Sequence, residues 1–590
     1  MYKESELRAS GSELQDGAPD ASPKFTLFRD LVHAIEGFPR HLSIHVGGML
    51  ITEPPLIDVV PTERATMPNR VVSQWNKDDI EDLGLIKLDL LSLRTLSMIQ
   101  EAVELICQQQ GVELDLAEIP LDDPEVYRML QEGNTIGCFQ VESRAQMQML
   151  PRMKPRRFED LIVEVALVRP GPIQGDVVRP YLRRRQGLEP VTTLHPLLEP
   201  ILAETLGVVV FQEQVIRIAM AVAGFSAGEA DMLRRAMSRS RSEEAMEELR
   251  ERFVRGALER GLGAELAQAI FEKLRGFASY GFCKSHAAAF ARTAYESCYL
   301  KVHYPAEFYC ALLNNQPMGF YSPDVIVGDA RRHGVEVLPP HVDRSRKLCT
   351  LEGGRIRLGF AYVKGLGEAA ISRLEEAQTQ GPFRTLREFC HRTRLPRRAV
   401  GHLIRVGATD HWGVPRRNLL WELGKISYPE ELDLALPTDN IRFPVLSRAE
   451  ELVEEYELLG LSPDDHPLAL YRPWLDREGV LSSGELVHEP DGSWVQVAGL
   501  AVVRQRPPTA KGFVFLTLED EEGLMNVIIR PDVYRHHRAV LENVALLLLG
   551  GRLQRRESVT NVMAHHIASL PALSHPIAQA PPPLTPSHPG

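Results

Sequence analysis

Lys87 and Asp89, in the segment GLIKLDLLSLRT, are the first residues whose types and spacing could do chemistry. Residues two apart on a strand face the same side, so this lysine and this carboxylate would lie together. A carboxylate can bind Mg²⁺, but the pair of Mg²⁺ ions used in phosphoryl transfer needs several converging carboxylates. No Asp-x-Asp precedes Asp89, and Glu113 with Asp115 have a comparable spacing only after it. Two interpretations follow: part of a metal site, or a surface pair on an edge strand.

Basic residues are concentrated between residues 146 and 185, where nine Lys and Arg face four acidic residues. Arg169 begins the segment RPGP, in which two prolines fix the backbone directly after the guanidinium, and Arg183, Arg184 and Arg185 follow. A guanidinium held in place is suited to bidentate contact with phosphate oxygens. The stretch therefore indicates either a phosphate-binding surface or a solvated helix face.

Two further basic clusters lie beside helical segments. Arg234 and Arg235 belong to ADMLRRAMSRSR, and Lys284 and His286 belong to YGFCKSHAAAFA. Phosphate contact is one interpretation of each cluster. Neither cluster by itself indicates which phosphate would be bound.

A glycine-marked turn precedes a predicted helix in YVKGLGEAAI, which contains Gly365 and Gly367. The free N–H groups at the start of such a helix could bind a DNA phosphate without reading the base sequence. Turns of this kind are also common as simple helix starts. Both interpretations stay open at this point.

Between residues 494 and 570 the pattern changes to a period of two, in WVQVAG, GFVFLTLEDEEG and MNVIIRP. Such short segments predict strands at the spacing of a small barrel. Basic and aromatic residues mix there as in an oligonucleotide-binding barrel, namely Arg504, Arg506, Lys511, Phe513 and Phe515. The two phenylalanines share a face, so they either stack on bases or belong to the core.

The remaining patterns indicate which elements carry these residues. Short β-branched runs before Asp89 predict strands, and apolar residues at helical spacing from Leu93 to Ile106 predict a helix that follows them. Helical patterns dominate from Asp122 to Asn315, and a mixed stretch comes next. We therefore predict a multidomain α+β fold.

Composition limits the class of protein. The 590 residues include 67 Lys+Arg and 79 Asp+Glu, so the formal charge is −12 and any basic surface must be local. The seven cysteines form no Cys-x-x-Cys pair, which argues against a disulfide framework and a structural zinc site. No run approaches the roughly 18 apolar residues of a membrane span, and the first residues are polar. We expect a cytoplasmic protein without a membrane partner.

With these pieces in order, the chain resembles the bacterial DNA polymerase III alpha subunit, family C, from about Arg40 to Leu570. The resemblance rests on a long colinear series that includes HVGGMLIT, CFQVESRAQMQML, ALVRPGP, FQEQVIRIA and FASYGFCKSHAAAFA. The segments LLNNQPMGFYSP, DARRHGVEVLPP and RLGFAYVKGLGEAA are most similar to the error-prone, damage-inducible branch of this family.

The resemblance implies a DNA-directed DNA polymerase that uses two Mg²⁺ ions and three palm aspartates. It places Asp89 as the third aspartate and a metal ligand, with Lys87 near the incoming triphosphate. The family's first two aspartates follow an N-terminal PHP domain, and neither is found here, so we expect a C-terminal part of such a polymerase. Nucleotide or phosphate contacts are implied for Arg169, Arg234, Arg235, Lys284 and His286, and DNA contacts for Arg183, Arg184, Arg185, Gly365, Gly367, Arg504, Lys511 and Phe513.

The same resemblance predicts the domain limits. They are a flexible arm over 1–24, a palm remnant over 25–106, mostly helical fingers over 107–345, a helix-hairpin-helix domain over 346–425, a connector over 426–485, an OB-fold over 486–571 and a disordered tail over 572–590.

Two functions of different classes are compatible with these features. The first is an error-prone, translesion DNA polymerase that is induced by DNA damage and acts in replication and repair, with its N-terminal half encoded separately or absent. The second is a non-catalytic DNA-binding or interaction protein, the remnant of such an enzyme. The expected partners are primer-template DNA, single-stranded DNA, deoxynucleoside triphosphates, a separate N-terminal polymerase half, and mutagenesis-cassette or sliding-clamp proteins.

Overall fold

The computed structural model describes residues 23–36, 38, 44–45, 47–168, 175–238, 243–278, 281–426, 441, 443–507, 510–556 and 559–571. The chain divides into two units, Met1–Leu93 and Arg94–Gly590. Apart from its last two residues, the arm predicted for 1–24 lies outside the described residues, as does the whole tail predicted for 572–590. None of the described helices has the length and apolar character needed to cross a membrane.

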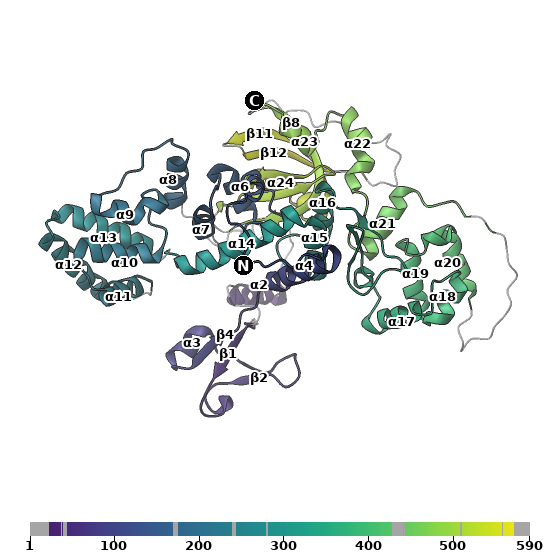
Figure 1. Cartoon of the computed structure of the whole chain (residues 1–590), viewed down its shortest axis with the longest axis horizontal. Coiled ribbons are helices and arrows are strands. Elements are labelled where there is room, and N and C mark those ends of the chain that lie inside the picture. The colour runs from purple at the N-terminus through teal and green to yellow at the C-terminus, as the bar shows by residue number, and fades with distance from the viewer. Residues whose placement is uncertain are drawn as a thin grey trace. The chain divides into compact units, whose positions relative to one another are not determined.

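The first unit contains two small sheets (Figure 1). Strand β1 pairs antiparallel with β4, so that Gly48 lies opposite Asp89, and β2 pairs with β3. The Oδ1 atom of Asn76 caps α3 by accepting from the N–H groups of the next helical residues. The elements are α2 (Pro23–Ile35), β1 (Gly48–Ile51), β2 (Thr62–Arg64), β3 (Val71–Ser73), α3 (Lys77–Asp82) and β4 (Ile86–Asp89).

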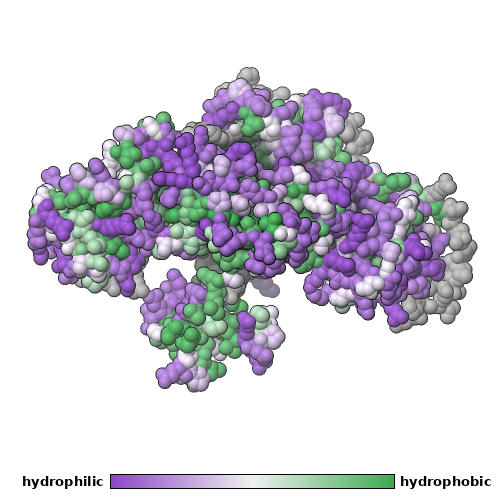
Figure 2. Space-filling view, viewed as in Figure 1, coloured by the Kyte–Doolittle hydropathy of each residue, from purple (hydrophilic) through white to green (hydrophobic). Residues whose placement is uncertain are grey.

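One face of the β1–β4 sheet is apolar and exposed. Met49 and Ile51 lie opposite Leu88 and Ile86 on that face, and all four side chains are exposed. Figure 2 shows apolar surface gathered over this unit. Among its described residues, only Val60 and Ile80 are buried, so the unit has little core of its own.

The second unit begins with helices that share one large core. The helix predicted after Leu93 is confirmed as α4, and the core continues through the segments before and after a separate bundle. Buried contacts join α4 to α15 and α7 to α14. The helices are α4 (Arg94–Gln110), α5 (Pro124–Glu132), α6 (Arg144–Met153), α7 (Phe158–Leu167), α8 (Gly175–Arg185), α14 (Lys284–His303), α15 (Pro305–Asn314) and α16 (Pro323–Arg332).

A buried ion pair and its hydrogen bonds connect three of these core helices. The Nζ atom of Lys301 in α14 lies 2.8 Å from Oδ2 of Asp329 in α16, and it also donates to the carbonyl of Ile136 at 3.0 Å. The hydroxyl of Tyr309 in α15 donates to the same carboxylate oxygen at 2.6 Å. Nζ of Lys301, Oδ2 of Asp329 and the hydroxyl of Tyr309 are therefore all paired, as burial requires.

A helical bundle lies between α8 and α14 in the sequence and has its own apolar cluster. Phe253 and Phe271 are fully buried at its centre. Helix α10 contacts α11, α12 and α13 (Figure 1). The elements are α9 (Glu199–Leu202), α10 (Gln212–Ala223), α11 (Ala227–Ser238), α12 (Glu243–Glu259) and α13 (Ala264–Ala278).

A small three-stranded sheet and four helices follow. The sheet has the order β5-β7-β6. The turn with Gly365 and Gly367 precedes a helix, as predicted. The elements are β5 (Val337–Leu338), β6 (Thr350–Glu352), β7 (Arg355–Arg357), α17 (Glu368–Gln378), α18 (Leu386–Thr393), α19 (Arg397–Arg405) and α20 (Arg416–Lys425).

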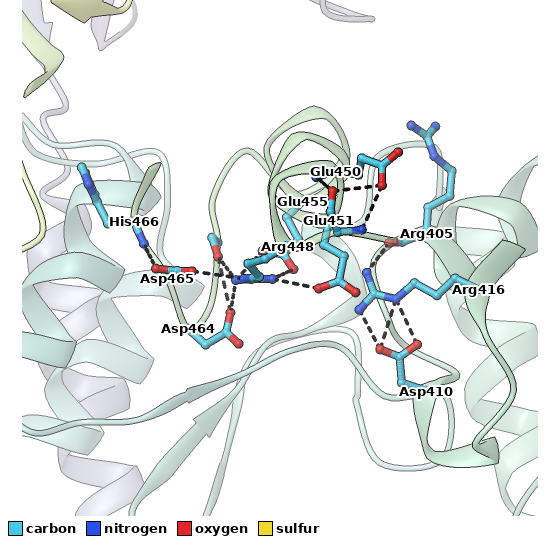
Figure 3. Close-up of polar contacts among 12 residues, drawn as sticks. Arg405, Asp410, Arg416, Arg448, Glu450, Glu451, Glu455, Asp464, Asp465 and His466 are labelled. Atoms are coloured by element: carbon cyan, nitrogen blue, oxygen red, sulfur yellow. Dashed lines mark hydrogen bonds and ion pairs between the residues drawn. The ribbon is translucent and has the colours of Figure 1, made fainter. Parts of the chain in front are cut away.

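Helix α21 (Arg448–Leu458) ties this helical region to the segment that follows it (Figure 3). Arg448 contacts Glu451, Glu455, Asp464 and Asp465, so one guanidinium holds the helix against the turn after it. Arg405 in α19 pairs with two glutamates of α21, at 3.2 and 2.6 Å. These contacts hold α21 against α19 on one side and against the turn with Asp464 and Asp465 on the other.

The chain ends in a closed barrel of five strands in the order β10-β12-β11-β8-β9. Only β10 and β12 pair in parallel, and α24 lies between the third and fourth strands. This arrangement confirms the predicted OB-type barrel and the multidomain α+β class. The elements are α22 (Pro467–Arg477), α23 (Ser483–Leu486), β8 (Trp494–Gln505), β9 (Val514–Glu519), β10 (Leu524–Ile529), α24 (Pro531–Asn543), β11 (Leu546–Arg556) and β12 (Val559–Ser569).

The barrel packs on both of its flanking regions. Tyr471 and Trp474 of α22 bury their rings against Ala498, Leu548 and Leu570 of the barrel. On the β9–β10 side, the guanidinium of Arg144 in α6 donates to the carbonyls of Leu516 and Val527 at 2.9 and 3.3 Å. Residues 467–477, within the segment predicted as a connector over 426–485, thus pack against the barrel.

Candidate functional site

Asp89 lies at the end of β4, and its neighbour Lys87 is on the same face, as the period of two predicts. The Nζ atom of Lys87 lies 2.5 Å from Oδ1 of Asp89. This hydrogen bond is the largest cause that lowers the pKa of Asp89, so the carboxylate is ionised at neutral pH. The opposite strand comes very close, because a Cβ on Gly47 would lie 2.5 Å from the carbonyl oxygen of Leu90. Both residues of the pair are exposed.

The described residues do not supply a metal site around Asp89. A set of three possible ligand side chains occurs elsewhere, at His341, Asp343 and His411, and it is the one set of this kind in the described ranges. Two Mg²⁺ ions need several carboxylates around them, and Asp89 provides one. The two-metal site therefore does not fit the described residues by themselves.

The histidine cluster is better explained as a structural contact than as a metal site. The Nδ1 atom of His341 accepts a hydrogen bond from the N–H group of Asp343 at 3.1 Å, so a neutral ring carries its proton on Nε2. Metal-bound histidines instead donate through the second ring nitrogen. Burial, followed by the nearby His411, lowers the pKa of His341 to about 4. The neutral ring of His341 stacks on the ring of His411.

The first turns of α10 and α14 meet and bring two of the predicted phosphate ligands to one region. Both carboxylate oxygens of Glu213 accept from the N–H group of Lys284 at 3.0 Å. One residue earlier, Gln212 accepts from Nη1 of Arg234 at 3.1 Å and donates to the carbonyl of Gly281 at 2.8 Å. Arg234 and Lys284 thus lie beside the starts of two helices, where Glu213 already accepts from the first N–H group of α14.

The cations of this region are held by acidic groups. Lys284 pairs with Glu204 through Nζ, and its ammonium also lies 5.6 Å from the ring centroid of Phe211. Arg234 and Arg235 share the two oxygens of Asp231, each at 2.8 Å. Arg234 and Arg235 are thus paired with a carboxylate of their own helix, α11.

The other predicted nucleotide ligands differ in how far they can be placed. His286 is exposed and its ring lies between Phe282 and Phe290, with centroid distances of 5.3 and 4.2 Å. Arg169 lies outside the described residues. The structure therefore brings together Arg234, Lys284 and His286 around the α10 and α14 starts, while the role of each stays a prediction.

Arg183, Arg184 and Arg185, at the end of α8, have different surroundings. Arg185 forms two hydrogen bonds with the buried carboxylate of Asp160, at 2.9 and 2.5 Å. Arg184 donates to the carbonyl of Leu206 at 2.7 Å, and Arg183 lies 3.5 Å from Glu189. Two of the three guanidiniums thus hold the fold together, and their replacement would test folding as much as DNA contact.

The turn with Gly365 and Gly367, before α17, has the backbone conformation that its glycines predict. Gly365 has φ +87°, a left-handed conformation that side chains disfavour, and a Cβ there would lie 3.1 Å from the ring of His402. Gly367 caps α17, whose first residue is Glu368. The turn presents the N-terminus of α17, which is the geometry expected for contact with a phosphate.

The predicted DNA-binding residues of the barrel lie around the end of β8 and the loop to β9. Arg504 donates to the carbonyl of Val544 at 2.6 Å, and Arg506 lies 4.9 Å from the ring centroid of Tyr534. Lys511 is exposed, with φ +49°. Phe513 is half-buried at the turn before β9, outside the barrel's cluster of buried residues, whereas Phe515 packs against Arg144 at 5.3 Å.

Sequence reasoning missed two groups of residues with clear positions. Gln212 and Glu213 connect Arg234 to Lys284, and in the sequence their segment FQEQ indicates only the family resemblance. Arg144 joins the helical core to the barrel through contacts more than 370 residues apart in sequence. A contact between residues so far apart in sequence leaves no local pattern. The visible local signal is that Arg144 directly follows Ser143, the N-cap residue of α6.

Comparison with known proteins agrees with this architecture. Residues 4–92 match the model described as bacterial DNA polymerase III alpha NTPase domain, residues 95–261 match the bacterial DNA polymerase III alpha subunit finger domain, and residues 334–419 match a helix-hairpin-helix motif. A helix-hairpin-helix region followed by an OB-type barrel is a combination typical of multidomain nucleic-acid-binding proteins.

Three relatives, each named error-prone DNA polymerase, are similar over nearly the whole chain. The identity is 44% over 583 residues for the protein from Anaeromyxobacter dehalogenans, 43% over 580 residues for that from Methylococcus capsulatus and 45% over 549 residues for that from Mycolicibacterium paratuberculosis. These matches cover 92 to 94% of this chain and 50 to 55% of the relatives. Along most of its length the chain is similar to proteins of the bacterial DNA polymerase III alpha-subunit family, and it spans about half the length of the relatives it matches.

Proposed function

We propose that the chain forms part of an error-prone DNA-directed DNA polymerase, which adds deoxynucleotides to a primer by phosphoryl transfer. The observation that carries the proposal is the match to relatives of that name along 94% of the chain, combined with an exposed Lys87–Asp89 pair at the end of β4. The damage-inducible, translesion role in replication and repair follows from the same resemblance. Asp89 would be one ligand of the divalent ions, with Lys87 beside it.

Contact with the incoming nucleotide is proposed for the region where α10 and α14 begin. Arg234, Lys284 and His286 lie there, and the two helix N-termini add partial positive charge. In the free protein, Glu204 neutralises Lys284, and a triphosphate would replace this carboxylate. Arg235 and Arg169 are proposed as further phosphate contacts.

Mg²⁺ is the proposed divalent ion, because hard oxygen ligands and substrate phosphates are its usual partners in phosphoryl transfer. When bound, a pair of such ions neutralises the charge on the attacking and leaving oxygens. Since the described residues supply only Asp89, the other carboxylates would come from the part of the relatives that this chain does not match. The proposed partners are therefore this complementary half, primer-template DNA and deoxynucleoside triphosphates. Sliding-clamp and mutagenesis-cassette proteins stay predictions.

A second candidate function is a DNA-binding protein without catalysis. The single carboxylate at Asp89 favours it, because one ligand cannot hold two metal ions. Both candidates require DNA binding, and only the first gives primer extension after the complementary half is added. Primer extension is therefore the measurement that separates them.

DNA binding by the whole chain should depend steeply on salt and little on base sequence. The proposed contacts are lysines, arginines and backbone N–H groups, which bind phosphates and do not read base edges. We expect log K to fall linearly with log salt, with a slope of about −0.9 per phosphate contact on duplex DNA. Fluorescence anisotropy with two unrelated sequences, at 50 to 300 mM KCl, measures this slope. An affinity indifferent to salt would contradict the proposal.

The barrel should bind single strands when made with its flanking helix. Because α22 covers Ala498, Leu548 and Leu570, a fragment over 463–571 is expected to fold more stably than one over 486–571. Phe513→Ala should weaken single-strand binding by roughly 1 to 3 kcal/mol if the ring stacks on a base. Anisotropy gives the affinity and circular dichroism gives the fold. If Phe513→Ala unfolds the fragment, the residue belongs to the core.

A further inference from the structure

A strongly basic pocket of about 820 Å³ lies where the end of α6, the start of α7 and the end of α8 come together. Its basic lining residues are Arg152, Lys154, Arg156, Arg157, Arg184 and Arg185, and Asp160 is the one acidic residue among those that line it. None of the lining residues is aromatic. Because like charges at this spacing repel, the arrangement favours an anion.

The turn between α6 and α7 is held by hydrogen bonds to its backbone. Arg185 donates to the carbonyls of Met153 and Lys154, both at 3.2 Å, and Gln186 donates to the carbonyl of Arg152 at 3.2 Å. Gln131 holds the next carbonyl, that of Pro155, at 2.8 Å. Four successive carbonyls therefore accept hydrogen bonds from fixed side chains, and the turn is a rigid base for its cationic side chains.

The acidic residue of the pocket is already neutralised. Both oxygens of Asp160 accept from Arg185, and Oδ2 also accepts from the N–H group of Arg156 at 2.9 Å. Arg157 lies 3.5 Å from the same carboxylate. Asp160 thus orients the turn and leaves no carboxylate to balance the remaining cations.

Three donor groups of the pocket have no carboxylate partner in the described part of the chain. The side chains of Lys154 and Arg156 are exposed, and neither has an acidic partner among the described residues. The Nε atom of Arg184 is buried without a hydrogen-bond partner in the described part of the chain. A buried guanidinium N–H without an acceptor is costly, and a bound oxyanion would supply one.

We infer that this pocket binds consecutive phosphates of a DNA strand. Guanidinium groups match phosphate oxygens in a bidentate way, and the pocket has room for more than one phosphate. The lack of an aromatic lining residue favours the sugar–phosphate backbone over a nucleotide, whose base would require a stacking partner. The inference rests on the proposed DNA-binding function and assigns the contact to Lys154, Arg156 and the Nε atom of Arg184 rather than to Arg183 and Arg185.

The test compares the wild-type chain with the double variant Lys154→Gln/Arg156→Gln, using a labelled single strand of 30 nucleotides. Loss of two phosphate contacts should make the slope of log K against log salt shallower by about 1.4, which is roughly a 25-fold loss of affinity at 0.1 M KCl. Arg128→Gln/Lys273→Gln removes two exposed cations outside the pocket and should leave both values unchanged. Arg156→Lys keeps the charge and should keep the wild-type slope.

Each outcome has a definite meaning. If the wild-type chain binds DNA and the Lys154→Gln/Arg156→Gln variant binds it equally well, the pocket assignment is wrong and the proposed function stands. If the wild-type chain does not bind DNA, both are wrong. Calorimetric titration with sodium tripolyphosphate separates the two sources of phosphate. Tripolyphosphate that binds the wild type but not the variant, and does not weaken DNA binding, would show that the ligand is a free polyphosphate and would overturn the DNA assignment.

Discussion

The 590-residue chain, supplied with Mg²⁺, a primer-template and all four deoxynucleotides, is expected to bind the DNA but not to extend the primer. Asp89 is the single carboxylate that its β4 strand provides, and two metal ions repel each other unless several carboxylates surround them. Addition of a polypeptide that carries the remaining half of a relative should restore extension. Gel electrophoresis of the primer measures the result.

In the restored enzyme, Asp89→Asn should reduce extension at least about a thousandfold, because charge stabilisation by a bound metal is worth several kcal/mol. DNA affinity should stay nearly unchanged, since the substitution leaves the basic residues of the second unit in place. Asp82→Asn, at the exposed end of α3, is the matched control and should leave extension unaffected. Extension by the chain alone would contradict the prediction, and Glu113 and Asp115 would be the next carboxylates to replace.

Lys301→Met should destabilise the helical core by about 3 to 5 kcal/mol. The Nζ atom of Lys301 is fully buried and lies 2.8 Å from Asp329, which is also buried. Removal of the ammonium leaves Asp329 as a buried carboxylate without its main counter-charge, and that is the costly way to break a buried ion pair. Methionine keeps much of the side-chain volume, so the effect reports the lost charge more than a cavity.

Native-state hydrogen exchange locates this effect. We expect the protection of amides in α14 and α16 to fall about 150-fold or more, which is the lower limit of 3 kcal/mol converted at 1.4 kcal/mol per tenfold. The double variant Lys301→Met/Asp329→Leu removes both charges and should recover much of the protection. Unchanged protection in the single variant would show that Tyr309 and His333 suffice to hold Asp329.

The pH dependence of the same variant has a definite sign. Burial raises the pKa of Asp329, but the charges of Lys301, His333 and Arg332 outweigh it, so the pKa lies below its ordinary value of 3.8. The pair therefore stabilises the wild type above that pH, and this stabilisation is lost as the pH falls through the lower folded-state pKa. Without Lys301 the carboxylate takes up a proton more readily. The difference between variant and wild type should thus be smaller at pH 4 than at pH 7.

Sequence periodicity determined those features that depend only on neighbouring residues. A period of two placed Lys87 and Asp89 on one face, and the structure joins them by a 2.5 Å ion pair. The change from helical to alternating patterns predicted the barrel, and the glycines of YVKGLGEAAI predicted the turn before α17. Each prediction needed no more than the backbone geometry of a strand, a helix start or a turn.

The tertiary structure decided which cations are engaged and which are available. Nothing near Arg185 in sequence predicts that it would bind Asp160, 25 residues away, or that the starts of α10 and α14, more than 70 residues apart, would place Arg234 near Lys284. The same is true of Lys154 and Arg156, which the basic stretch contains but does not distinguish. The partners of long charged side chains depend on how the helices pack, and local sequence patterns carry no information about that packing.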